Sequence, residues 1–396
     1  MIYFDNSATT SIAPEVVEAM LPYLTVEYGN PSSKYYTLAR NAQRAVDESR
    51  ERVAALIGAK PEEIIFTCGA TESNNMIIKG VADYRKYYER RGNHLITSNI
   101  EHHAVLNACR YLNGEIYSNH DATFSLGGRG AVVDRGYEVT FLEADPLGRV
   151  LPEALDGAIR PETTLVTLMW ANNEIGTIND IPALCGAAHR HGVPFHTDAT
   201  QVSGKLPVDV RQAPVDYMSL SAHKFHGPKG VGAAYIRSDE YGLPPMTAFL
   251  HGGGQESGIR AGTLPVHNIV GFGKAAELAL ARQAEQTKRL KQIDTAARAL
   301  FADTDMFELL GDPDAHIPGL LSVIVRKDVF DNERFIKKVS GRCAISSGSA
   351  CTAGEPSHVL QAIGRSDETS RVLRISLSDT SSIEDVKYLV EQLKNL

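Results

Sequence analysis

The chain has 396 residues, of which 43% are hydrophobic and 22% are charged. This apolar content can build a large core, and the length exceeds that of one ordinary domain, so we expect two lobes or a large lobe with a smaller one. The net charge of −8 disfavours a nucleic acid or an anionic membrane as the main partner, because both attract basic surfaces.

No apolar run approaches the roughly 20 residues that span a bilayer, and residues 1–5 lack the basic start of a secretory signal. The five cysteines are odd in number and lack CxxC spacing; they are Cys68, Cys109, Cys185, Cys343 and Cys351. This pattern disfavours a disulfide framework and favours a reducing cytoplasm. Cys109 and Cys185 fall in apolar helix patterns and are predicted to be buried, and we interpret Cys68 as a packing residue.

Strand-like and helix-like segments alternate through the first two thirds of the chain. Strands are expected at residues 63–67, 94–97, 137–142, 164–170 and 194–197. Helices are expected after residue 71, through residues 104–112, from Pro152, and from Pro182 to His191. This alternation predicts a mostly parallel sheet that is covered by helices on both faces.

The pattern changes after residue 265. Residues 266–300 are predicted to form one long helix, and residues 319–325 and 372–377 read as antiparallel strands of a second, α+β lobe. The polar, glycine-rich residues 113–136 are interpreted as a surface insertion.

Lys224 is the first candidate for chemistry, because it lies between His223 and His226 before a Gly-Pro turn. A lysine in such a setting can form a Schiff base with an aldehyde cofactor. A surface lysine at a turn is the alternative, and it is commoner for a lone lysine.

Asp198 follows a predicted parallel strand, at the edge where open α/β sheets bind their ligands. A carboxylate there can keep a pyridine nitrogen protonated, although Asp198 alone could also cap a helix. Residues 68–75 lie between a strand and a helix, and their small side chains favour a phosphate site at the helix N-terminus. A plain helix cap is the alternative for this segment.

Ordered motifs along nearly the whole chain resemble one family. They are residues 3–10, 29–33, 69–75, 101–102, 172–176, 196–201, 221–230, 260–263, 346–351, 356–359 and 373–376. Together they resemble the fold-type-I pyridoxal-phosphate (PLP) enzymes, and more closely the NifS/IscS-type cysteine desulfurases of the class V aminotransferase group.

The resemblance implies how the ring of the cofactor is held. Lys224 would form the Schiff base, and Asp198 would pair with the pyridine nitrogen. Gln201 would donate a hydrogen bond to the phenolic oxygen. His102 would stack on the ring and assist proton transfer.

The resemblance also implies a phosphate site. Ala70, Thr71, Ser221 and His223 would hold the phosphate, and Thr263 would reach in from the other subunit of a homodimer.

The substrate implied is L-cysteine, whose carboxylate Asn173 and Arg374 would bind. Lys224 would remove the α-proton. Cys351 would take the sulfur as a persulfide and leave L-alanine. A small buried hydrophobe is the alternative reading of Cys351, but its neighbours are Gly, Ser, Ala and Thr and offer no core.

The fold implied is α/β, the PLP-dependent transferase fold type I. A large domain (residues 13–262) would hold the mostly parallel sheet flanked by helices. A smaller α+β domain (residues 1–12 and 263–396) would carry the Cys351 loop and Arg374. The partner would be a sulfur-acceptor protein that serves iron–sulfur cluster assembly, tRNA thiolation or cofactor synthesis.

The sequence departs from the family after Cys351, where residues 352–355 are about two residues shorter than the usual long loop. This shortening puts the choice of acceptor in question. Selenocysteine lysis, aminotransfer and a non-enzymatic partner-binding role remain as alternatives. We expect no metal site, because His102, His103, His189 and His191 lack further ligands at zinc spacing; His189 and His191 are interpreted as a helix C-terminal cap.

Overall fold

The computed structural model describes residues 1–115, 133–348 and 357–395. The helices of these residues are α1 (Pro14–Thr25), α2 (Thr37–Ile57), α3 (Ala70–Tyr87), α4 (His103–Leu112), α5 (Pro152–Ala158), α6 (Ile181–Arg190), α7 (Val266–Ala302), α8 (Asn332–Val339), α9 (His358–Ala362) and α10 (Ile383–Lys394). Short 3₁₀ helices are η1 (Pro61–Glu63), η2 (Ala222–Lys224), η3 (Glu256–Gly258) and η4 (Ser366–Arg371).

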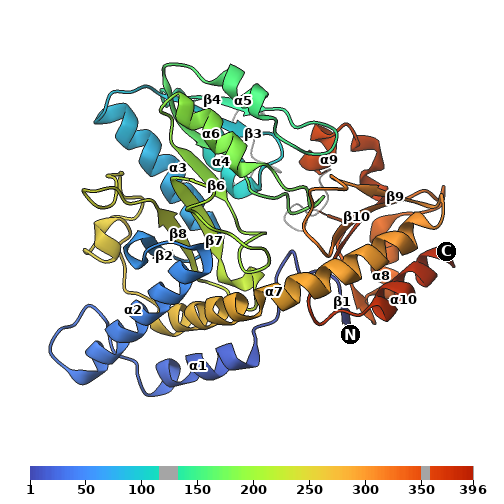
Figure 1. The fold of residues 1–396 in the computed structure, drawn as a ribbon, viewed down its shortest axis with the longest axis horizontal. Coiled ribbons are helices and arrows are strands. Elements are labelled where there is room, and N and C mark those ends of the chain that lie inside the picture. Colours follow the sequence, from blue (N-terminus) through green and yellow to red (C-terminus); the bar gives the residue numbers. More distant parts are fainter. Residues whose placement is uncertain (116–132, 349–356, 396) are drawn as a thin grey trace.

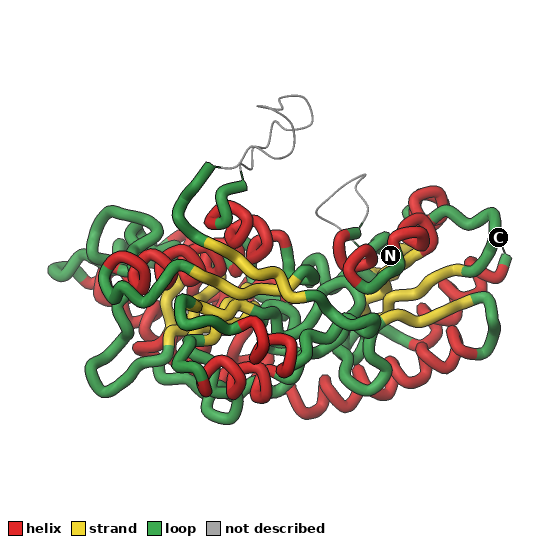
Figure 2. The backbone as a smooth tube through the Cα atoms, turned by 90° about the horizontal axis from the view of Figure 1, so that it is seen from above, coloured by secondary structure: helices red, strands yellow, loops and turns green. Residues whose placement is uncertain are grey.

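The strands fall into two separate groups, which Figure 2 shows as two patches of yellow. They are β1 (Ile2–Tyr3), β2 (Ile64–Thr67), β3 (His94–Ser98), β4 (Glu138–Leu142), β5 (Thr163–Thr167), β6 (Phe195–Asp198), β7 (Tyr217–Ser221), β8 (Gly232–Ile236), β9 (Phe307–Leu310), β10 (Leu320–Val325), β11 (Cys343–Ala344) and β12 (Val372–Ser376).

The larger sheet has seven strands in the order β2-β8-β7-β6-β5-β3-β4. From β7 to β4 every neighbouring pair is parallel, and β8 pairs antiparallel with both β2 and β7. The expected mostly parallel sheet is therefore confirmed. Parallel strands end at a common edge, and this edge places Asp198 of β6 beside the register partner Ser219 of β7.

Both faces of this sheet are covered, as predicted. Along β2, Ile64 and Phe66 belong to one apolar core, and Ile65 between them belongs to another. Successive side chains of a strand point to opposite faces, so the two cores lie on opposite sides of the sheet. The first core includes residues of α2, α5, α6 and α7, and the second includes residues of α3 and α4.

A third core joins the start of the chain to its last third. Phe4 packs in this core with residues of α7, α8, α10 and the antiparallel sheet β12-β10-β9. β1 also pairs in parallel with β11. The long α7 crosses from the large sheet to this smaller group of elements (Figure 1). These contacts support the division of the chain into residues 13–262 on one side and residues 1–12 and 263–396 on the other, which stays a prediction.

Three details differ from the sequence-based expectations. The strand expected at residues 164–170 ends at Thr167, and β7 and β8 were not predicted at all. The long helix continues to Ala302. Most of the expected insertion, residues 116–132, lies outside the described residues. No helix formed by the described residues is long and apolar enough to cross a bilayer.

Candidate active site

A cavity of about 530 Å³ opens at the carboxyl ends of the parallel strands. Asp198 ends β6 and Ser221 ends β7, and both line it. Ten of the predicted site residues line this one cavity; they are Ala70, Thr71, His102, Asn173, Asp198, Gln201, Ser221, His223, Lys224 and Arg374. Side chains that are up to 304 positions apart in the chain (Ala70 to Arg374) therefore meet in one place.

Two of the predicted residues are not among the described residues that line this cavity. Thr263 is exposed and does not line the cavity of its own chain. Its expected role is in the cavity of a second subunit, so its position does not test that role. Cys351 lies outside the described residues.

One end of the cavity is formed by the start of α3. The N-cap Gly69 has φ 152° and ψ 174°, a region that essentially only glycine adopts, and no side chain caps the helix there. A side chain at Gly232 would also lie 2.7 Å from the Gly69 Cα atom, so two glycines allow the turn and β8 to meet. The uncapped N–H groups of an 18-residue helix thus border the cavity and favour an anion.

Cationic side chains act on His223, which lines the same cavity. Burial and the charges of Lys224, Lys229 and Lys205 together lower the pKa of His223 to about 4. The His223 ring is therefore neutral at neutral pH, and although burial is the larger cause, the three lysine charges also make the surroundings of the ring positive. Such a potential and an uncapped helix start fit the phosphate of the expected cofactor.

Asp198 is held by two donors inside the cavity. Its Oδ2 accepts a hydrogen bond from Asn74 Nδ2 (2.8 Å), and its Oδ1 accepts one from the Thr200 N–H (3.0 Å). The residue is only 7% exposed. Because neutral groups hold this carboxylate, it can offer its charge to a ring nitrogen in the cavity, which fits a pyridine cofactor.

His102 is the N-cap of α4, and its hydrogen bond defines its tautomer. Its Nδ1 accepts a hydrogen bond from the Ala104 N–H (3.1 Å), so the neutral ring carries its proton on Nε2. Burial lowers the pKa of His102 and keeps the ring neutral. The preceding Glu101 is fully buried, and this burial raises its pKa to about 8 although Ser98 and the Met169 N–H donate to it.

Lys224 lies in η2, next to the N-terminal segment. Its Nζ donates to the carbonyl oxygens of Ser7 (2.6 Å) and Ala8 (3.0 Å), and both residues line the cavity. The Gln201 Nε2 also donates to the Ser7 carbonyl (3.1 Å). Residues 3–10 form one of the family motifs, but this motif did not predict that the carbonyl groups of Ser7 and Ala8 accept hydrogen bonds from Lys224.

Arg374 is 2% exposed and reaches the cavity from β12. Its Nη1 donates to the carbonyl oxygens of Asn173 (3.1 Å) and Gly348 (2.8 Å), and its Nη2 forms an ion pair with Asp5 (2.8 Å). Its Nε is buried without a partner among the described residues. Sequence reasoning did not single out Asp5. Because Asp5 already pairs with Arg374, a bound carboxylate would share the guanidinium with this carboxylate of the protein.

The cysteine predictions have mixed outcomes. Cys109 and Cys185 are buried, as expected. The interpretation of Cys68 as a packing residue was wrong, because Cys68 is exposed and lines the cavity. It precedes the Gly69 turn, which directs it outward, and its surroundings and the Glu72 carboxylate raise the pKa of its thiol to about 11. The thiol is therefore protonated at neutral pH and is a poor nucleophile.

The two histidines at the end of α6 contact acidic side chains. His191 is the C-cap of α6, as expected, and its Nε2 lies 3.1 Å from Asp156. His189 lies in the last turn of the helix, and its Nε2 contacts Asp216 at 2.7 Å. Among the described residues, no group of three or more His, Cys, Asp or Glu is placed to hold a metal ion.

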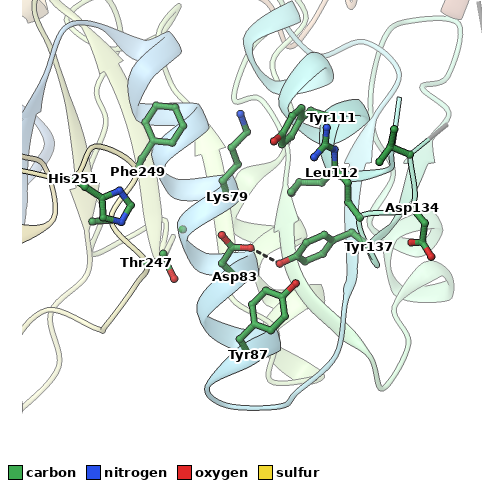
Figure 3. A pocket seen from close by; sticks show the side chains of 14 residues that line it. Lys79, Asp83, Tyr87, Tyr111, Leu112, Asp134, Tyr137, Thr247, Phe249 and His251 are labelled. Atoms are coloured by element: carbon green, nitrogen blue, oxygen red, sulfur yellow. Dashed lines mark hydrogen bonds between the residues drawn. The ribbon is translucent and has the colours of Figure 1, made fainter. Parts of the chain in front are cut away.

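A second cavity of about 450 Å³ lies along α3 and shares no described lining residue with the first. Figure 3 shows Lys79 directed toward Tyr111, and Asp83 hydrogen-bonded to the hydroxyl of Tyr137. The Lys79 Nζ lies 4.4 Å from the ring centre of Tyr111 and 5.3 Å from that of Phe249. None of the ten predicted site residues above lines this cavity, so we do not assign the chemistry to it.

The chain is similar to known proteins along nearly its whole length. The aminotransferase class-V family profile matches residues 2–389. The cysteine desulfurase IscS of Methylococcus capsulatus is 41% identical over 397 residues, which cover 100% of this chain and 92% of the relative.

Two solved structures are also similar to this chain. A NifS-like protein has a TM-score of 0.85 at 33% identity, and the match covers 100% of this chain and 98% of the other. A structure of SspA in complex with cysteine has a TM-score of 0.79 at 36% identity, with 96% and 100% covered. The expected fold, a mostly parallel sheet flanked by helices with a smaller α+β part, is thereby confirmed. This chain belongs to the aminotransferase class-V family.

Proposed function

We propose that this chain is a PLP-dependent cysteine desulfurase. It converts L-cysteine to L-alanine and leaves a persulfide on Cys351 for transfer to an acceptor protein. The observation that carries this proposal is the meeting of the Lys224 amine, the Asp198 carboxylate and the Arg374 guanidinium in one cavity that begins at an uncapped helix. The similarity to relatives called cysteine desulfurases supports the same activity.

The residues that would hold PLP are those of the cavity. Ala70 and Thr71 at the start of α3, with Ser221 and His223, would bind the phosphate, and Asp198 would face the ring nitrogen. Bound PLP supplies an electron sink that stabilises negative charge at the α-carbon of an amino acid.

Four side chains would act on the substrate. The Lys224 Nζ takes the α-proton of cysteine, and in the structure two carbonyl groups orient this amine. Arg374 and Asn173 hold the substrate carboxylate, for which the unpartnered Nε of Arg374 offers a donor. His102 presents the proton on its Nε2 to the cavity, because its Nδ1 is occupied by the backbone.

Cys351 would complete the reaction. Its thiolate attacks the substrate sulfur, and the Cβ–Sγ bond breaks with its electron pair moving to the carbon. A proton at that carbon completes the methyl group of alanine. Cys351 is left as a persulfide, which is the form in which an acceptor thiol can take the sulfur.

The quaternary and cellular setting is also proposed. Thr263 is exposed beside Gly262, and it would contribute to the cavity of the partner in a homodimer. The four described cysteines are free thiols, which supports a reducing cytoplasm. The sulfur would serve iron–sulfur cluster assembly, with tRNA thiolation as another destination.

The products distinguish this activity from the alternatives. Purified protein loaded with PLP should form alanine and, with a thiol reductant, an equal amount of sulfide from L-cysteine. A keto acid in place of alanine would show transamination, and turnover restricted to selenocysteine would show a selenocysteine lyase. A protein that takes up no PLP would refute the proposal and favour a role in partner binding.

A further inference from the structure

Lys205 is hydrogen-bonded to Gln201, a residue that lines the cavity. Its Nζ donates to the Gln201 Oε1 at 3.1 Å. Gln201 lines the cavity and is 5% exposed, whereas Lys205 does not line the cavity. Both residues lie in the turn that follows β6, where the Leu206 N–H bonds to the Val202 carbonyl.

The hydrogen bonds of Gln201 determine which way its amide faces. The Lys205 Nζ carries N–H donors in both protonation states, and in the structure it donates to the Gln201 oxygen. The Gln201 Nε2 then points the other way and donates to the Ser7 carbonyl (3.1 Å). That carbonyl also accepts from the Lys224 Nζ (2.6 Å). One chain of hydrogen bonds therefore connects Lys205 to Lys224 through Gln201.

Lys205 interacts electrostatically with several residues that line the cavity. Burial, followed by the charges of Lys224 and Arg374, lowers the pKa of Lys205 to about 7. The charge of Lys205 also contributes to the low pKa of His223. From α7, the contacts to this turn come from the neutral side chains of Gln283 and Thr287, which bond to the carbonyls of Leu206 and Lys205.

We propose that Lys205 is a positioning residue that fixes the Gln201 amide with its Nε2–H available to the PLP ring. The proposal rests on the proposed function, in which Gln201 donates to the ring hydroxyl oxygen of PLP. Without Lys205 the amide can turn over, because its oxygen no longer has a dedicated donor. A flipped amide would place an oxygen against the Ser7 carbonyl and against the cofactor.

The experiment uses PLP-loaded full-length protein and measures the visible absorption band and the dissociation constant of PLP. Lys205→Met should shift the band in the same direction as Gln201→Leu and weaken PLP binding about 3- to 10-fold, the effect of one hydrogen bond. Lys205→Arg keeps a donor-only head group and should restore the wild-type band. The double variant Lys205→Met/Gln201→Leu should match Gln201→Leu alone.

Lys229→Met is the control for charge. Lys229 lines the same cavity and is exposed, and no hydrogen bond to Gln201 is seen for it. A band shift equal to that of Lys205→Met would assign the effect to lost charge and overturn the positioning role. Additive effects in the double variant, or an unshifted band in folded Lys205→Met, would also overturn it.

A misfolded variant and a failure of the proposed function can both be told apart from a failure of the positioning role alone. If Lys205→Met does not fold, Lys205→Gln replaces it, since a glutamine head group can accept as well as donate and should give the same shift in weaker form. If the wild-type protein shows no visible band with PLP, the proposed function fails and the positioning role fails with it. A wild-type band with additive variants refutes Lys205 alone.

Discussion

Replacing Asp198 by asparagine should remove charge from the cavity while leaving the fold intact. The Asp198 Oδ1 accepts from the Thr200 N–H, and a backbone donor cannot turn away, so the asparagine oxygen must take that place. The new Nδ2 would then face the Asn74 Nδ2. The Asn74 amide can flip so that its Oδ1, which has no partner among the described residues, accepts the new hydrogen bond. The expected cost in stability is about 1 kcal/mol, the scale of one exchanged hydrogen bond.

The expected cost in activity is larger. A hydrogen bond to a charged group contributes about 1.5–3 kcal/mol, and its loss from the step that needs the protonated ring corresponds to about a 10- to 150-fold lower kcat. The neutral amide keeps the shape of Asp198 but cannot hold a proton on a pyridine nitrogen. The loss should therefore appear in kcat more than in the amount of PLP bound.

The assay compares alanine formation and thermal unfolding of the variant with those of Asp180→Asn. Asp180 is the exposed N-cap of α6, and asparagine caps a helix equally well, so this control should keep the wild-type kcat and melting temperature. A folded Asp198→Asn protein whose kcat stays within a factor of two of wild type would refute the role given to the carboxylate.

Two further predictions concern stability. Glu256 is 7% exposed and accepts two hydrogen bonds from Arg50, so Glu256→Gln should destabilise the protein by about 3 kcal/mol in urea unfolding at fixed protein concentration; a loss below about 1 kcal/mol contradicts the buried pair. The Asp216 carboxylate raises the pKa of His189 from 6.5 to about 10. A raised pKa stabilises the fold fully below the unfolded value and no longer does so once the pH exceeds the folded value. The melting temperature lost in His189→Gln should therefore be larger at pH 6 than above pH 10, and an equal loss at both would contradict the pairing.

Local sequence patterns predicted those parts of the fold that depend on local interactions. The strands β2, β3 and β6 appear where short runs rich in apolar and β-branched residues predict buried strands, and the helix α7 appears where apolar residues recur with a helical period. β8 was missed because Gly232-Ala-Ala-Tyr-Ile contains few β-branched residues and takes its strand form from pairing with β2 and β7. Leu168 to Trp170 are apolar but lie beyond the end of β5 at Thr167, although the Leu168 and Trp170 N–H groups still donate to carbonyl oxygens of β6.

The candidate site was predictable where a motif carries a reactive side chain, as for Lys224 and Asp198. Long-range partners could not be found in this way. Asp5 pairs with Arg374 across 369 positions, and Ser7 meets Gln201 across 194. No local period reports such a contact, because it depends on how the two parts of the chain pack together.

The sequence carries a signal for the outward position of Cys68. A cysteine directly before a glycine that starts a helix lies at the same turn that exposes the backbone N–H groups. It therefore faces the cavity, although the residues before it in β2 are buried.

Identifying the residue that carries the transferred sulfur tests the proposed chemistry most directly. PLP-loaded protein should be treated with L-cysteine, alkylated, digested and analysed by mass spectrometry, with alanine measured in parallel. We expect one added sulfur atom on the peptide that contains Cys351, none on Cys68, and no alanine formation in Cys351→Ala. Added sulfur on Cys68, or unchanged alanine formation in Cys351→Ala, would contradict it.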